Sequence, residues 1–179
     1  MSDSVNSLPY IGWAKDEKIR IAFLLQDATL WPAWESLYNT CTSDKRFETR
    51  IFLVPKVEFT YDSVSKTQDF LDSAGIPYTQ FSHSLFEAFS PHAALLQTPY
   101  DYLGREPYLY SGHLKSMGIR VIYVPYGIEF VDTPSARHDH FRSPVVKNAW
   151  RLYTMSDAFA SEYRKYCPCL LYTSPSPRD

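Results

Sequence analysis

The chain has 179 residues, of which 45% are hydrophobic and 21% charged, a composition that can bury the core of about one domain. Lys+Arg 18 against Asp+Glu 20 gives a formal net charge of -2, and this balance argues against sequence-independent nucleic-acid binding, which needs clustered Lys and Arg. No apolar run approaches about 18 residues, so no membrane-spanning segment is expected. The chain has three cysteines, which do not make a disulfide framework. These features predict a cytoplasmic protein.

The first half of the chain reads as alternating strands and helices. Residues 1–18 form a polar leader without the pattern of a secretory signal. Residues 19–25 are nearly all apolar, which is typical of a strand buried on both faces of a parallel sheet. Apolar residues at spacings of three and four predict a helix over 31–43, with Pro32 in its first turn. A second strand is expected over 47–54.

The same alternation continues through the middle of the chain. A helix is expected over 61–74, and Gly75 is the residue that should end it. A short strand at 76–78 should lie near the edge of the sheet, because Pro77 cannot donate to a ladder of hydrogen bonds. The next strand is expected at 93–97.

The last predicted elements are a helix over 107–117, ended by Gly118, strands at 119–124 and 150–155, and a helix over 156–166. Parallel strands joined by crossover helices place those helices on the faces of one sheet. The predicted fold is therefore a doubly wound, mostly parallel α/β domain of the Rossmann-like class, covering residues 19–168.

Residues 169–179, CLLYTSPSPRD, differ from everything before them, because they end in alternating Ser and Pro without a periodic apolar face. The segment is identical to a translation of a transposase-type sequencing adapter. We therefore interpret it as an adapter-derived tail that is not native, and we expect it to lack regular structure and to make few contacts with the domain. A natural disordered Ser/Pro tail is the alternative.

In an open parallel sheet, ligands bind beyond the carboxyl ends of the strands. The residues just after three predicted strands are polar, aromatic or Gly/Pro, and the substrate-binding candidates among them are Gln26, Asp27, Gln97, Tyr100 and Gly127. Each of these residue types is also common in turns that have no function. Their coincidence at three strand ends predicts a cleft at this edge.

Three sequence motifs that would assign a cofactor or a nucleophile are missing. No G-x-G-x-x-G follows the first strand, no G-x-x-x-x-G-K-[ST] exists, and no G-x-S-x-G appears. The sequence therefore disfavours a dinucleotide-dependent dehydrogenase, a P-loop NTPase and an α/β-hydrolase. No cofactor is expected.

A histidine pair could form half of a metal site, since imidazole and carboxylate both suit zinc. It lies in His138-Asp139-His140, within a stretch that reads as a polar loop without a further Cys or Glu ligand. We interpret these as solvated loop histidines and expect no bound metal.

Three stretches together resemble a known family. They are residues 21–38 with the following Asp44-Lys45-Arg46-Phe47-Glu48; Leu96-Gln97-Thr98-Pro99-Tyr100-Asp101; and 121–128 with 150–166. The set is similar to the N-terminal half of CDP-glycerol glycerophosphotransferase-like proteins, which have the two-domain GT-B architecture of many glycosyltransferases. The likeness spans roughly residues 18 to 166.

The resemblance implies a transferase that moves glycerol phosphate, or a sugar, from a nucleotide-activated donor to a hydroxyl acceptor in the synthesis of cell-wall or surface polymers such as teichoic acid. In such proteins the N-terminal domain faces the polymer or lipid-linked acceptor, and a C-terminal domain makes most donor contacts. The present chain, as an acceptor-side fragment, is then expected to be inactive alone. Family members often work at the inner face of the cell membrane.

The resemblance also points to a catalytic residue. The family carries a His-Gly-Thr-Pro-like motif in the loop after a central strand, and its histidine is the presumed general base. The matching loop here is Pro125-Tyr126-Gly127-Ile128, which places Tyr126 where the histidine stands. We expect Gly127 to allow a sharp turn with positive φ that presents the Tyr126 hydroxyl to the cleft, close to Gln26 and Asp27. A tyrosine is a poorer base than histidine at neutral pH.

A second hypothesis belongs to another class, namely a non-catalytic α/β binding or regulatory module similar to receiver domains. Such domains need clustered acidic residues near the first strand, and Asp27 alone does not meet that need. A second α/β domain encoded further along the gene would favour the transferase.

Overall fold

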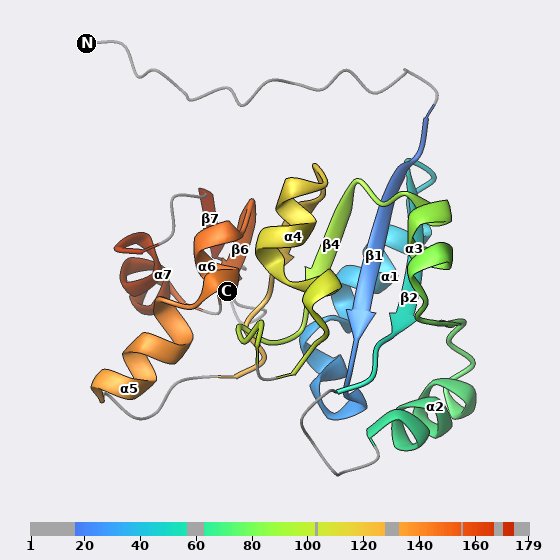
Figure 1. Ribbon diagram of the computed structural model, residues 1–179, viewed down its shortest axis with the longest axis horizontal. Coiled ribbons are helices and arrows are strands. Elements are labelled where there is room, and N and C mark those ends of the chain that lie inside the picture. Colours follow the sequence, from blue (N-terminus) through green and yellow to red (C-terminus); the bar gives the residue numbers. More distant parts are fainter. Residues whose placement is uncertain are drawn as a thin grey trace.

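The computed structural model describes residues 17–56, 63–102, 104–127, 133–154, 156–166 and 170–173. Their centre is one sheet in the strand order β3-β2-β1-β4-β5-β6-β7, and every pairing is parallel (Figure 1). Strand order reverses between β1 and β4, which is the switch point of a doubly wound sheet. The structure confirms the predicted Rossmann-like α/β fold.

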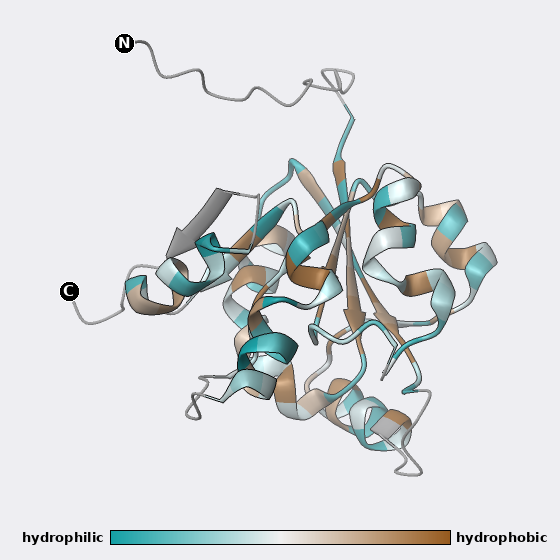
Figure 2. Ribbon diagram, turned by 60° about the vertical axis from the view of Figure 1, so that its left-hand side comes forward, coloured by the Kyte–Doolittle hydropathy of each residue, from teal (hydrophilic) through white to brown (hydrophobic). Residues whose placement is uncertain are grey.

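The central strands carry the core, and the nearly continuous apolar run of residues 19–25 is covered on both faces of the sheet, as predicted. They are β1 (Ile19–Leu25), β2 (Phe47–Leu53), β4 (Ala93–Leu96), β5 (Arg120–Tyr123) and β6 (Arg151–Thr154). In Figure 2 the strands at the centre of the sheet are mostly brown, the colour of hydrophobic residues. Within β1, Leu24 joins one hydrophobic cluster and Phe23 the cluster on the opposite face, because side chains alternate along a strand.

One face of the sheet is covered by the 3-10 helix η1 (Ala28–Ala33), by α1 (Glu35–Ser43) and by α2 (Ser63–Ser73). Trp34 is fully buried there and meets Phe23 edge to face, with ring centroids 5.7 Å apart. Gly75 follows α2 with φ 65, as predicted for the residue that ends this helix.

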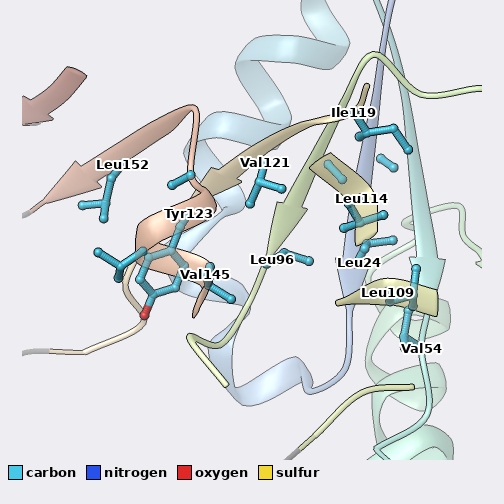
Figure 3. Packing of buried hydrophobic residues seen from close by; sticks show 14 of the residues in the cluster. Leu24, Val54, Leu96, Leu109, Leu114, Ile119, Val121, Tyr123, Val145 and Leu152 are labelled. Carbon is cyan, nitrogen blue, oxygen red and sulfur yellow. The ribbon is translucent and has the colours of Figure 1, made fainter. Parts of the chain in front are cut away.

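The other face is covered by α3 (His83–Phe89), η2 (Pro107–Leu109), α4 (Ser111–Ser116), α6 (Pro144–Asn148) and α7 (Asp157–Arg164). Figure 1 shows α3 and α4 in front of the sheet and α1 behind it. In the close-up of Figure 3, leucine and valine side chains from these helices meet those of the strands, and Tyr123 points away from β5 beside Val145. Gly118 ends α4 with φ 81, as predicted.

The predicted strand at 76–78 is wrong, and residues 83–89 form a helix that the sequence analysis does not predict. The short strand β3 is Thr79–Gln80 rather than 76–78, because the backbone N–H of Ile76 donates to the Leu71 carbonyl and closes the end of α2 instead. Helix α3 was not predicted at all. Its short length hides the apolar period, although the Ser82 hydroxyl caps it by accepting from the N–H of Leu85.

The stretch that was interpreted as a polar loop with solvated histidines is helical. It contains α5 (Pro134–Ala136), the π-helix η3 (Arg137–Phe141) and α6. Two signals for these helices are present in the sequence, because Thr133 and Ser143 each precede a proline and cap the helix that follows. Short helices with few apolar residues are poorly marked by periodicity alone.

The expectation that the tail lacks regular structure is also wrong. Leu170–Thr173 forms β7, which pairs in parallel with all four residues of β6. Residues with strand propensity can pair with an open sheet edge whatever their origin. The rest of the predicted tail, 169 and 174–179, lies outside the described residues, as does the polar leader up to residue 16. Among the residues that the structure describes, no helix is both long and apolar enough to cross a bilayer.

Candidate site at the carboxyl edge of the sheet

The side chain of Gln97 joins the ends of β1 and β4 at the switch point. Its Oε1 accepts from the backbone N–H groups of Gln26 at 2.9 Å and Asp27 at 3.0 Å, and its Nε2 donates to the carbonyl of Asp27 at 2.8 Å. The residue is 1% exposed. Three of the predicted binding residues are therefore brought together, and the Gln97 amide is engaged by the backbone.

Asp27 begins η1 and closes an ion pair. Its Oδ1 accepts from the backbone N–H and the hydroxyl of Thr29 at 3.0 and 2.7 Å, and its Oδ2 lies 2.5 Å from Nζ of Lys56. Burial by itself raises the pKa of Asp27, but the hydrogen bonds from Lys56 and Thr29 outweigh it and hold the pKa below its usual value. The carboxylate thus stays ionised at neutral pH and is occupied by its partners.

A crevice beside the switch point is too narrow to hold a water molecule. It is lined by Leu24, Gln26, Val54, Leu96, Arg105 and Leu109. The Gln26 side chain, 3% exposed, donates from Nε2 to the carbonyl of Gly104. Gln26 therefore anchors the loop that follows β4.

Further along the edge, Tyr100 meets His140. The Tyr100 hydroxyl lies 3.3 Å from Nε2 of His140, and the two rings meet edge to face at 5.9 Å. Tyr100 follows β4, whereas His140 lies in the π-helix η3, and both side chains are half-buried. Such π-helical turns are rare and occur frequently at functional sites.

Tyr123, the last residue of β5, lies near several other phenol groups at the same edge. Tyr123 is 1% exposed, and burial raises the pKa of its hydroxyl well above the usual value. The nearby phenols of Tyr163, Tyr126 and Tyr100 raise that pKa further, while the Arg105 guanidinium lowers it. The hydroxyl groups at the ends of β4 and β5 thus form one cluster.

Tyr126 lies at the rim, 37% exposed. Within the described part of the chain, no hydrogen bond links its side chain to Gln26 or Asp27. Gly127 is exposed too, and the expectation of a positive φ there is wrong, because the described glycines with positive φ are Gly75 and Gly118. The turn after β5 is made without that conformation.

Behind the rim lies a buried polar network. Arg105, 3% exposed, donates from one terminal nitrogen to the carbonyl and the hydroxyl of Thr98 at 2.6 and 2.7 Å, and its other terminal nitrogen is 3.5 Å from Oδ1 of Asp101. Burial lowers the pKa of Arg105 to about 10, so the guanidinium remains charged at neutral pH. Asp101 in turn accepts from the backbone N–H and the hydroxyl of Ser111.

Sequence reasoning missed three contributors to this edge, namely Arg105, Tyr123 and His140. Tyr123 lies next to the end of the strand predicted at 119–124, so its closeness to the rim could have been predicted. Arg105 and His140 lie in segments without a periodic signal, and only the fold brings them to the edge. His138 contacts Asp139 at 3.1 Å, and the described residues contain no group of three His, Cys, Asp or Glu side chains that could hold a metal ion.

No protein-family model matches the sequence, and no curated protein matches it either.

Proposed function

We propose that the chain is the acceptor-side domain of a transferase that moves glycerol phosphate, or a sugar, from a nucleotide-activated donor to a hydroxyl acceptor in cell-wall or surface-polymer synthesis. The proposal draws on the resemblance of residues 18 to 166 to the N-terminal half of CDP-glycerol glycerophosphotransferase-like proteins. The observation that carries its chemistry is the 3.3 Å contact between the Tyr100 hydroxyl and Nε2 of His140 at the carboxyl edge.

In this transfer the oxygen of the acceptor attacks the phosphorus that carries glycerol, the bond from that phosphorus to the nucleotide breaks, and the nucleoside monophosphate leaves. The acceptor hydroxyl must lose its proton in the same step. Imidazole is the side chain that most often takes a proton near neutral pH. We place the acceptor hydroxyl against the Tyr100 oxygen, so that Tyr100 receives its proton while passing its own to Nε2 of His140. The phenol ends neutral and the proton rests on His140.

Tyr126 remains a second candidate for the catalytic hydroxyl, because it takes the place of the family's histidine. Its exposure of 37% leaves it open to a ligand at the rim. We propose that Tyr126 and Gly127 orient the acceptor and that Tyr126 does not take its proton, since a phenol is a weak base at neutral pH.

The donor is expected to bind elsewhere in the parent protein. Two cations near this edge, Lys56 and Arg105, already face the carboxylates of Asp27 and Asp101. Donor phosphates would therefore rely on a C-terminal domain, and the polymer or lipid-linked acceptor would approach Tyr100 and Tyr126. We further propose that the parent works in the cytoplasm at the inner face of the cell membrane.

The test uses the product of the complete gene, incubated with CDP-glycerol or nucleotide sugars and a panel of hydroxyl acceptors, with acceptor-dependent nucleotide release as the readout. Tyr100→Phe and His140→Gln should each lower kcat by roughly 10²-fold, because each breaks the proton path. Tyr126→Phe should cost about tenfold, the effect of one lost hydrogen bond. Tyr102→Phe is the matched control, since Tyr102 is 53% exposed on the same loop.

Two results would contradict the assignment. If Tyr126→Phe lost roughly 10²-fold while Tyr100→Phe stayed within a few-fold of the parent, the proton path would run through Tyr126 instead. A folded full-length protein that released no nucleotide with any donor and acceptor would favour the alternative, a non-catalytic α/β binding or regulatory module.

A further inference from the structure

Tyr100 lies in a loop that is fixed from beneath by buried side chains. Two residues before it, Thr98 accepts twice from Arg105, and one residue after it, Asp101 accepts twice from Ser111. Asp101 is 5% exposed and Ser111 is fully buried. The backbone on each side of Tyr100 therefore has little freedom, although loops of this kind are usually the mobile part of a fold.

His140 belongs to a different segment, which is anchored by its own apolar residues. Phe141, the next residue, is 6% exposed and packs against Tyr163 with ring centroids 4.7 Å apart. Helix α6 follows directly, and both Val145 and Val146 are fully buried. Buried side chains therefore hold both the π-helix and α6 against the core, and such packing resists sliding.

One side chain connects these two segments below the rim. Asn148, the last residue of α6, donates from Nδ2 to the Ser111 hydroxyl oxygen at 3.1 Å, and that hydroxyl donates to Oδ2 of Asp101 at 2.6 Å. The chain of bonds thus runs from the segment that carries His140 to the residue next to Tyr100.

We infer that Ser111 and Asn148 are positioning residues, which set the contact between Tyr100 and His140 through Asp101. A hydroxyl and a ring nitrogen 3.3 Å apart are at the outer limit of a hydrogen bond, so a small shift of either segment breaks it. The consequence for transfer rests on the proposed function, whereas the positioning itself does not.

The experiment records the imidazole signals of the chain by NMR at one fixed pH, with His140→Gln to assign the signals of His140. Tyr100→Phe gives the reference chemical shifts for a His140 that has lost its phenol partner. Ser111→Ala removes one buried hydroxyl and both of its side-chain bonds, and Asn148→Ala removes only the link to α6. We expect both variants to move the His140 ring signals toward their positions in Tyr100→Phe, while the other histidines keep the parent chemical shifts.

Thr67→Val is the matched control, because Thr67 is 1% exposed and its hydroxyl accepts from the backbone N–H of Ala28 on the other face of the sheet. It should lower stability and leave the His140 ring signals unchanged. The inference is overturned if Ser111→Ala and Asn148→Ala leave these signals at their parent positions, or if Tyr100→Phe itself fails to move them. Should Ser111→Ala fail to fold, the half-buried Asn148→Ala decides alone. If the signals move as expected but Tyr100→Phe leaves transfer unaffected, the positioning stands and the proposed function fails.

Discussion

The side-chain amide of Gln97 binds the backbone of Asp27 twice, accepting from its N–H at 3.0 Å and donating to its carbonyl at 2.8 Å. The two residues lie at the ends of neighbouring parallel strands, where the ladder of backbone hydrogen bonds stops. The amide of Gln97 thus replaces the next rung of that ladder. Polar groups at this edge therefore stabilise the fold and are not present only to bind a ligand.

Replacing Gln97 with Leu should lower the free energy of unfolding by about 2–4 kcal/mol, since it leaves buried backbone groups of Gln26 and Asp27 without partners. Urea unfolding measures the loss. Gln80→Leu is the control, because Gln80 is exposed on β3 and should change stability by less than about 0.5 kcal/mol. Equal effects from both variants would contradict the proposed role of Gln97.

A half-buried histidine at the opposite edge should make the fold sensitive to mild acid. Nδ1 of His92 accepts from the backbone N–H of Arg20 at 2.9 Å, which requires an unprotonated nitrogen. Burial, followed by the charge of Arg20, lowers the pKa of His92 below its usual value, and Arg120 adds to this while Glu17 opposes it.

Because the folded pKa of His92 is depressed, the unfolded chain binds more protons between the two pKa values. The contribution of His92 to stability is therefore fully present above the unfolded pKa of about 6.5. Below that pH the free energy of unfolding falls, by at most about 1.4 kcal/mol per pH unit. His92→Asn keeps an acceptor near the position of Nδ1 and should flatten this slope in urea unfolding at a series of pH values. His138→Asn, at an exposed position, should leave the slope unchanged.

The buried Arg105 should be far more important for stability than an exposed arginine. Arg105→Met leaves the carboxylate of Asp101 and the carbonyl of Thr98 without a cationic donor, and the expected loss is about 3–5 kcal/mol. Arg46→Met removes an ion pair with Asp44 whose arginine side chain is 78% exposed, and it should change stability far less, because solvent screens an exposed pair. Thermal and urea unfolding of both variants test the difference.

Removing residues 169–179 should have a small effect on the stability of the domain. Among the described residues, strand β7 is the edge of the sheet and pairs with the four residues of β6, so the unfolding free energy should fall by about 1 kcal/mol or less. The uncovered edge of β6 should increase self-association, which light scattering after size-exclusion chromatography would detect. A loss of several kcal/mol would instead mean that this segment is integral to the domain and would contradict its interpretation as an adapter-derived tail.

The sequence alone determined the architecture, because long apolar runs and helical spacings report burial locally. Strand β1 shows this best, since its run of apolar residues required two covered faces and hence crossover helices. Gly75 and Gly118 likewise marked the helix ends, where a positive φ is needed.

Only the tertiary structure decided which polar side chains meet at the carboxyl edge. Tyr100 and His140 lie 40 positions apart, and nothing in their neighbours' types encodes the contact. It arises because β4 and the segment before β6 are packed on one sheet and joined below by Ser111 and Asn148. Local patterns indicate which residues face the core. A site depends instead on distances between residues far apart in the chain, and packing sets those distances.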